Sequence, residues 1–233
     1  ACTASPQEAT IGSMPDRRHR KHSAATVPCR LVALLLAAML LAACGHADDH
    51  GVRSRTVQFD KLPFRVVSID LGKAPLALYW HNPDTRQPFG NIEALKQWGD
   101  RHGRKLLFAA NAGIYDSQRA PLGLYVENGK TLVPLNTAHG DPRQGNFSLL
   151  PNGVFSIDTG GRASVQTTKD WNRKHAAPRW ATQSGPMLVI DGELHPRFLP
   201  DSDSRNIRNG VGTSADGGRT VFAIADEPVT FFE

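Results

Sequence analysis

The spacing of apolar and polar residues predicts strands and one helix in the first half of the chain. Residues 64–71 alternate as in a half-buried strand, with Val66 and Ser68 on one face. We expect residues 75–82 to pair with this strand after a turn. Apolar residues then recur every three to four positions across residues 91–103, which predicts a helix that ends at Gly103.

A short apolar run follows the predicted helix and ends in polar residues. Residues 105–110 predict a buried strand, and Asn111, Gly113 and Asp116 come soon after it. Polar groups at the end of a strand often carry chemistry in proteins with mixed structure. A single Asn after a strand is more often a turn former or a cap, so both interpretations of Asn111 stay open here. Asp116 is the acidic residue nearest to this cluster.

Four turn signals, each between two apolar runs, predict hairpins in the second half of the chain. They lie at Asn128-Gly129, residues 158–161, Asp191-Gly192 and residues 216–218. Hairpins in series after one or two helices indicate an α+β fold with a mixed, mostly antiparallel sheet and few helices. Strands and helices do not alternate, so a doubly wound fold is excluded.

The first 43 residues resemble an export leader with its start at Met14. Five basic residues lie between positions 17 and 30, and the apolar run 31–41 is shorter than the roughly 20 residues of a bilayer span. Leu41-Ala42-Ala43-Cys44 then resembles a bacterial lipobox, in which Cys44 is lipidated and becomes the mature N-terminus. A retained membrane anchor and a chance match are the alternatives, and the flanking residues favour lipidation.

This interpretation divides the chain into a leader (1–43), a lipidated Cys44 with a polar tether (44–56) and one domain (57–233). A domain of about 175 residues is long enough for a real core. Gly45 after Cys44 favours sorting to the outer membrane. We therefore expect an exported bacterial lipoprotein of the cell envelope, held on the periplasmic side of the outer membrane by its N-terminal lipid.

Charge and cysteine content narrow the function further. The leader holds five of the 27 Lys and Arg residues and two of the 22 Asp and Glu residues, which leaves 22 against 20 and a net charge of +2. The basic pI of the whole sequence therefore reflects the leader and does not indicate nucleic-acid binding. Cys44 is the only cysteine after the leader, so the fold has no internal disulfide.

The common catalytic and metal-binding signatures are missing from the sequence. Ser184 has no glycine two residues before it, so it is no nucleophile of the G-x-S-x-G kind. No H-E-x-x-H motif occurs, and the run after Asp201 lacks the glycine and glutamate of a calcium-binding loop. No P-loop or dinucleotide-binding motif is present. We expect no metal and no cofactor.

Two stretches gather polar groups and glycines as binding sites do. The run 204–212 contains Arg205, Arg208, Asn209 and Gly212, and guanidinium groups bind phosphate through paired hydrogen bonds. A surface loop with solvated arginines is the alternative. The second stretch contains Gln183, Ser184 and Gly185 before a predicted strand that opens at Pro186, for which a plain β-turn is the alternative.

Several motifs occur together in the order of one family. They are NAGIYD, PLGLYVENGK, GNFSLLPNGVF, ATQSGPMLVIDGELHP, SRNIRNGVG and VFAIADEPVTFFE. In this order the chain from Phe64 to Glu233 resembles the bacterial branch of the phosphodiester glycosidases. These are relatives of the lysosomal uncovering enzyme, which removes N-acetylglucosamine from a sugar phosphodiester.

The resemblance implies a hydrolase that acts on a sugar-1-phosphodiester or another phosphate-containing glycan. The resemblance places the family's Asn-x-Gly turn on Asn111–Gly113, its pre-strand glycine on Gly185, and its arginine and following glycine on Arg208 and Gly212. We expect Asn111, Asp116 and Arg208 to be catalytic, with Asp116, the acid next to Asn111, as the candidate general base. The residues expected to bind substrate are Gly113, Gln183, Ser184, Gly185, Arg205, Asn209 and Gly212. The resemblance also implies that the domain continues after Glu233.

A rival hypothesis of a different class remains at this stage. Glycosidases ordinarily use two carboxylates, and the sequence shows no convincing pair. The chain therefore also fits a non-catalytic envelope lipoprotein that binds a glycan or polymer. A site without paired carboxylates favours this second hypothesis.

Overall fold

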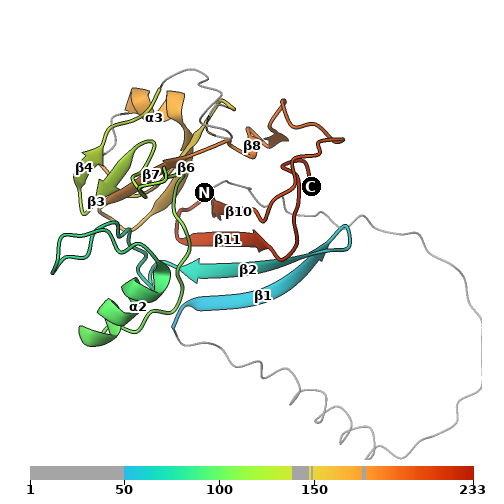
Figure 1. Ribbon diagram of the computed structural model, residues 1–233. Coiled ribbons are helices and arrows are strands. Elements are labelled where there is room, and N and C mark those ends of the chain that lie inside the picture. The colour runs from blue at the N-terminus through green and yellow to red at the C-terminus, as the bar shows by residue number, and fades with distance from the viewer. Residues whose placement is uncertain (1–49, 138–146, 148, 175–176) are drawn as a thin grey trace, which may run out of the picture. The chain divides into compact units, whose positions relative to one another are not determined.

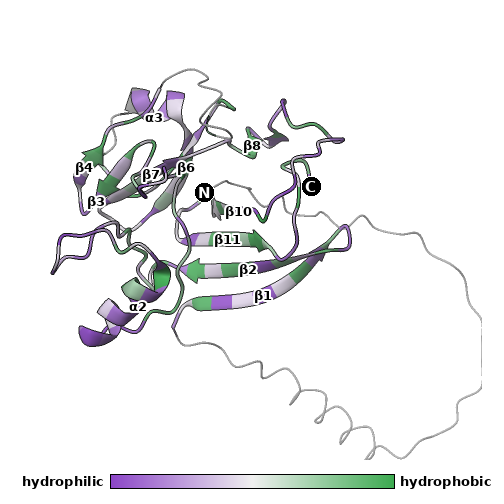
Figure 2. Cartoon of the chain, in the orientation of Figure 1, coloured by the Kyte–Doolittle hydropathy of each residue, from purple (hydrophilic) through white to green (hydrophobic). Residues whose placement is uncertain are grey.

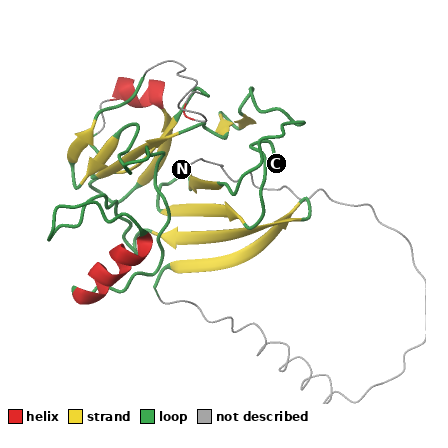
Figure 3. Cartoon of the chain, in the orientation of Figure 1, coloured by secondary structure: helices red, strands yellow, loops and turns green. Residues whose placement is uncertain are grey.

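Two antiparallel sheets form the frame of the chain in this computed structural model (Figures 1 and 3). The structure describes residues 50–137, 147, 149–174 and 177–233, and residues 50–233 belong to one compact unit. The first sheet has the strand order β1-β2-β11-β10, and the second has the order β4-β3-β7-β5-β6. The named strands of the described residues all pair antiparallel. The expected α+β class is confirmed.

The strands are short and come from both halves of the chain. The first sheet contains β1 (Val52–Phe59), β2 (Leu62–Asp70), β10 (Asn209–Thr213) and β11 (Arg219–Ala225). The second contains β3 (Tyr125–Glu127), β4 (Lys130–Val133), β5 (Gly153–Ile157), β6 (Ala163–Thr167) and β7 (Trp180–Ser184). A separate small hairpin consists of β8 (Val189–Ile190) and β9 (Glu193–Leu194). The helices are α2 (Ile92–Arg101) and α3 (Thr168–Lys174).

The local predictions of turns and of the helix are confirmed. All four turn signals join consecutive antiparallel strands, and the turn after β3 has positive φ at both Asn128 (50°) and Gly129 (81°). The helix α2 begins after Asn91, whose side chain accepts a 2.8 Å hydrogen bond from the Ala94 N–H. Gly103 follows its end with φ of 66°, in the left-handed region where glycine is favoured.

Three predictions about strands are wrong. Residues 75–82 form no strand; β2 pairs instead with β1 and with β11, whose Arg219 lies opposite Asp70. Residues 105–110 belong to no strand of the described residues. Residues 52–56, which the sequence analysis placed in the tether, belong to β1. This edge strand shows purple and white bands of polar residues along much of its length (Figure 2).

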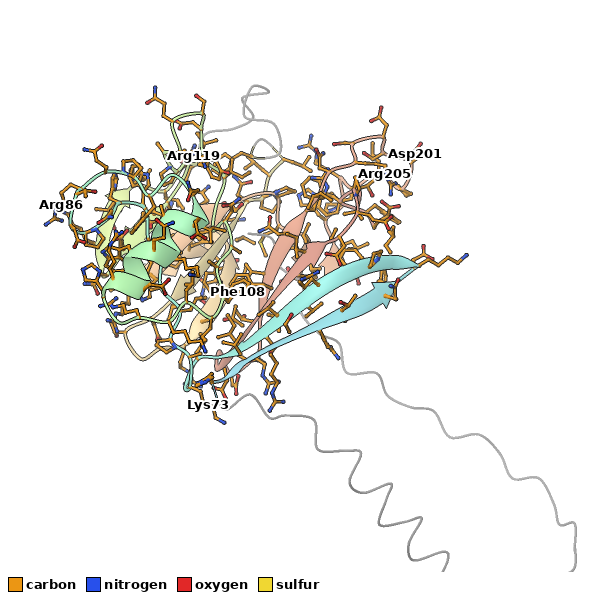
Figure 4. All side chains as sticks on the ribbon, turned by 60° about the horizontal axis from the view of Figure 1, so that its bottom comes forward. Lys73, Arg86, Phe108, Arg119, Asp201 and Arg205 are labelled. Carbon is orange, nitrogen blue, oxygen red and sulfur yellow. The ribbon has the colours of Figure 1, made fainter. Side chains whose placement is uncertain are left out.

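The second sheet lies between a helix and the first sheet. On one face Trp171 of α3 packs with Leu124, Val126, Val154 and Ala181. On the other face, residues of β5, β6, β10 and β11 make a shared cluster, with Phe155, Ile157, Ala163 and Val211 buried and Phe222 against them. Phe108, labelled in Figure 4, packs against the buried residues of the first sheet. The centroid of its ring lies 4.8 Å from that of Phe222.

The predicted leader and lipidation site lie outside the described residues. This holds for residues 1–43, for Cys44 and for residues 45–49 of the tether that follows it. Within the described residues, no helix has both the length and the apolar character that a membrane span needs.

Candidate functional site

The turn Asn111–Gly113 lies directly against the end of β7. A Cβ atom added to Gly113 would come within 2.6 Å of the Gln183 carbonyl oxygen and of the Thr182 hydroxyl. No side chain fits at that distance, so the sequence needs glycine here for a close approach. Ser184 lies two residues after Thr182 and points to the same face of the sheet.

The start of β10 reaches the same turn from the other sheet. The Asn209 side-chain amide donates a hydrogen bond of 3.5 Å to the Asn111 carbonyl oxygen, across 98 residues of sequence. Gly212 lies further along β10, opposite Val221 of β11. The structure therefore joins Asn111, Gly113 and Asn209 with the end of β7, although three distant segments carry them.

Gly185 makes a second close approach, to a buried asparagine. A Cβ atom added to Gly185 would overlap the Asn152 side chain, whose Oδ1 atom is the nearest neighbour. Asn152 is fully buried and donates a 3.1 Å hydrogen bond from Nδ2 to the Phe147 carbonyl oxygen. Its Oδ1 atom has no hydrogen-bond partner among the described residues. Gly185 therefore places the end of β7 against the residue that precedes β5.

The amide group of the Gln183 side chain forms hydrogen bonds inside the protein. Its Oε1 atom accepts hydrogen bonds of 3.0 Å from the N–H groups of Leu124 and Asn136, and its Nε2 atom donates one of 2.8 Å to the Asn136 carbonyl oxygen. Gly123 makes room for it, since a Cβ there would lie 2.5 Å from Oε1. This geometry does not fit the expected direct contact of Gln183 with substrate. It indicates that Gln183 positions neighbouring segments. Gln183 also lies inside β7 and not, as the alternative interpretation of the sequence had it, in a β-turn before a strand.

Asp116 holds its own loop together. Its Oδ1 atom accepts hydrogen bonds from the backbone N–H groups of Gln118 (2.8 Å) and Ala120 (2.9 Å), in the loop marked by Arg119 in Figure 4. Asp116 is exposed, and this bonding is typical of an aspartate that forms a turn. The geometry gives the general-base role of Asp116 no support.

Arg208 has a fixed position beside Asn209. Its Nε atom donates to the Val229 carbonyl oxygen (2.9 Å), and its Nη2 atom donates to the Ser204 carbonyl (2.7 Å) and hydroxyl (3.3 Å) oxygens. The guanidinium carbon lies 3.6 Å from the centre of the Phe231 ring. A flat cation on an aromatic face is attracted by the ring's negative face. The structure thus holds the charge of Arg208 by backbone oxygens and one ring.

Arg205 ties the same segment to the residues that follow β11. It forms an ion pair of 3.0 Å with Glu233 and donates a 3.1 Å hydrogen bond to the Pro228 carbonyl oxygen. The pKa of Glu233 is lowered, first by the hydrogen bond from the Thr230 N–H and then by Arg205. Arg205 and Asp201, both labelled in Figure 4, belong to the segment before β10. Arg205 therefore connects the loop before β10 with residues 228–233.

The sequence analysis missed residues that support this region. Asn152 stands in a Pro-Asn-Gly run, which is typical of a turn, so nothing in the pattern indicated a buried amide. Phe231 and His195 were also missed, because their contacts join segments far apart in the sequence. Among the residues that the structure describes, no group of three or more His, Cys, Asp and Glu side chains is arranged to hold a metal ion.

Comparisons with known proteins agree with this arrangement. A family model described as phosphodiester glycosidase matches residues 104–233, which contain every one of the joined segments. The chain is also 36% identical over 156 residues to the Escherichia coli (strain K12) protein named "Uncharacterized protein YigE". That match covers 67% of this chain, and the chain spans only 58% of the length of that relative. By its sequence and the segments that meet in its fold, the chain belongs to the phosphodiester glycosidase family.

Proposed function

We propose that this protein hydrolyses a sugar-1-phosphodiester to free sugar and a phosphate monoester in the bacterial cell envelope. The observation that carries the proposal is the meeting of Asn111–Gly113, the end of β7 and Asn209 in a chain of this family. Amide and hydroxyl groups from these segments suit the hydroxyl groups of a sugar, since each can both donate and accept hydrogen bonds.

The reaction breaks the bond between the anomeric carbon and the phosphate oxygen. A water oxygen bonds to the anomeric carbon and releases one proton to the solvent, while the electron pair of the broken carbon–oxygen bond leaves with the phosphate monoester. Such a leaving group is a stable anion, so its departure depends more on charge stabilisation than on protonation. A fixed positive charge near the departing oxygen therefore lowers the barrier.

Arg208 is the residue we assign to this charge stabilisation. The assignment rests on the position of Arg208 next to Asn209, whose side chain contacts Asn111. The Arg208 side chain itself contacts Val229 and Ser204. Held by backbone oxygens, the guanidinium needs no reorientation during the reaction. Asn111 and Asn209 then hold the sugar or the attacking water, and Ser184 lines the same face.

The reaction itself is tested with isotopic water. The whole protein is incubated with a sugar-1-phosphodiester in water enriched in oxygen-18, and both products are analysed by mass spectrometry. Cleavage between carbon and oxygen places the label in the free sugar. Label in the phosphate monoester contradicts the proposed glycosidase reaction, and no cleavage of any substrate in a series contradicts an enzymatic role.

Variants of the two arginines test the assigned charge. Arg208→Ala is expected to lower kcat/KM by about 10²–10³, the usual loss when one preorganised charge-stabilising group is removed. Arg208→Lys restores only part of the rate, because an ammonium group cannot make the same set of hydrogen bonds. Arg205→Ala is the matched control and loses less, since Arg205 contacts the loop and Glu233. Full activity of folded Arg208→Ala excludes the assignment.

A glycan-binding protein without catalysis is the second candidate. It is favoured by the hydrogen bonds of Asp116 to its own loop, which leave no assigned pair of carboxylates among the described residues. Binding of a sugar phosphodiester without label in either product supports this candidate.

The envelope location is part of the proposal and rests on the lipobox. Cys44 is proposed as the lipid-modified mature N-terminus, and membrane attachment then follows from the acyl chains. Mass spectrometry of the protein from membranes is expected to show an acylated peptide that begins at Cys44. An unmodified Cys44 joined to residues 14–43 contradicts this.

A further inference from the structure

Four flat side-chain groups form a continuous stack that runs from Arg208 to His195. The Arg208 guanidinium lies on the Phe231 ring at 3.6 Å, and Phe231 stacks on Phe198 with centroids 5.2 Å apart and planes at 12°. Phe198 in turn stacks on His195, with centroids 4.9 Å apart and planes at 25°. We call these four residues the aromatic column.

The far end of the column is fixed to the entry of β5. His195 is buried and its Nε2 atom lies 3.0 Å from the Leu150 carbonyl oxygen. Its Nδ1 atom accepts a 3.2 Å hydrogen bond from the Arg197 N–H, so Nε2 carries the proton that it donates to Leu150. Leu150 lies two residues before Asn152, the buried contact of Gly185. The column therefore connects Arg208 to the segment that supports the end of β7.

We propose that Phe231 is a positioning residue that fixes the Arg208 side chain for the proposed reaction, with Phe198 and His195 as its support. Backbone oxygens hold the Nε and Nη2 atoms of Arg208, and the Phe231 ring holds the face of the same group. Hydrogen bonds alone leave a guanidinium free to tilt about its edge. A ring on its face removes that freedom, and the charge keeps one position relative to Asn209.

The neighbouring residue Phe232 offers a matched control. It is 41% exposed, and no ring or cation contact joins it to the other described residues. Phe231→Leu and Phe232→Leu remove rings of equal size at consecutive positions. Only Phe231→Leu removes the ring that packs on the Arg208 guanidinium. Only this variant is therefore expected to change the position of the Arg208 side chain.

Nitrogen-15 NMR of arginine side chains reads this position without any substrate. In the whole chain in detergent, the Arg208 Nε–H proton is expected to exchange with water more slowly than that of Arg205 and to be shifted upfield by the Phe231 ring. Phe231→Leu should raise its exchange rate about tenfold, the loss expected when a cation–π contact is removed. Phe232→Leu should leave it unchanged. Equal rates in the wild type and Phe231→Leu overturn the proposal.

The wild type gives a second test that does not depend on the folding of a variant. Equal ring-current shifts and equal exchange at Arg205 and Arg208 also overturn the proposal. This readout needs no activity, so it separates a failure of the column from a failure of the proposed reaction, on which the role of Phe231 in catalysis rests.

Kinetics then distinguish positioning from a general loss of stability. If the reaction occurs, Phe231→Leu is expected to lower kcat about tenfold with less than about a twofold change in KM, because the charge acts mainly in the transition state. Phe231→Tyr keeps the ring and should restore kcat. A change in KM alone, or failure of Phe231→Tyr to restore kcat in a folded protein, contradicts the positioning role.

Discussion

The two sides of the candidate site are built by opposite means. Around β7, the glycine side consists of Gly113, Gly123 and Gly185, which let backbone and buried amides approach where no Cβ fits. Before β10, the arginine side consists of Arg205 and Arg208, which reach across to residues 228–233. One side depends on the absence of side chains and the other on the longest ones.

This difference predicts whether a substitution mainly lowers stability or mainly lowers activity. On the glycine side, Gly123 and Gly185 are buried and Gly113 is half-buried, and the neighbours of Gly113 include backbone atoms that cannot move aside. A change there should cost stability of the whole domain. The arginine side is partly exposed to water, which replaces lost hydrogen bonds at little cost. A change there should loosen one segment and affect activity more than global stability.

Gly185→Ala should have the largest effect on stability. The new Cβ overlaps the Asn152 side chain, which is fully buried and held by Phe147. Forcing an extra methyl group into such a core costs about 3 kcal/mol or more of the free energy of unfolding. Chemical denaturation followed by circular dichroism measures this loss.

Gly218→Ala is the control for this prediction. A Cβ added to Gly218 meets no atom closer than 3.5 Å, and its φ lies outside the left-handed region. Its free energy of unfolding should change by no more than about 0.5 kcal/mol. If Gly185→Ala unfolds at the same denaturant concentration as Gly218→Ala, the glycine side is not the rigid part of the site.

Gln183→Ala should cause the second largest loss of stability. It also decides whether Gln183 positions neighbouring segments or contacts substrate directly. Without its amide, the N–H groups of Leu124 and Asn136 lose their acceptor, and one buried unpaired group already costs about 2 kcal/mol. The exposed Gln118 supplies the control Gln118→Ala. A Gln183→Ala protein of normal stability that no longer binds substrate would restore the original hypothesis of direct contact.

Local signals were enough to predict much of the fold. Asn128-Gly129 and the other turn residues act within a few positions, and so does the Asn91 cap of α2. The pairing of residues 75–82 with β2 was wrong because the true neighbour, β11, lies about 150 residues further along the chain. The run 105–110 suggested a buried strand by its composition, yet Leu107 is 42% exposed.

The sequence predicted those site residues that stand together in a short polar run, and it did not predict contacts between distant segments. The run around Arg208 and Asn209 stood out by composition, and the structure brings Asn209 to Asn111. Asp116 resembled a catalytic acid because sequence does not show that its Oδ1 atom caps a turn. Phe231 was missed because a stacked ring leaves no local pattern in the sequence.

Arg208→Ala should loosen the arginine side without unfolding the domain. It removes the hydrogen bonds to Val229 and Ser204, which are partly exposed, so the free energy of unfolding should fall by only about 1 kcal/mol. Amide hydrogen exchange should rise in residues 228–233 and stay unchanged in β5 and β7. A loss of protection throughout the second sheet would show that the two sides are one cooperative unit.

The smallest effect should come from pH, through His195 at the far end of the aromatic column. Burial lowers the pKa of His195, the hydrogen bond with Leu150 partly opposes this effect, and the positive charge of Arg197 adds a smaller lowering. Because the unfolded chain then binds the proton more readily, the contribution of His195 to the free energy of unfolding is fully present above about pH 6.5 and is lost as the pH falls from there toward the folded pKa.

Denaturation midpoints measured between pH 8 and 5 should decline over this window. His195→Gln should remove that part of the decline, whereas His81→Gln, at a histidine outside the column, should keep it. A decline of equal size in His195→Gln would place the titrating group elsewhere, and the column would then have no part in the pH dependence of stability.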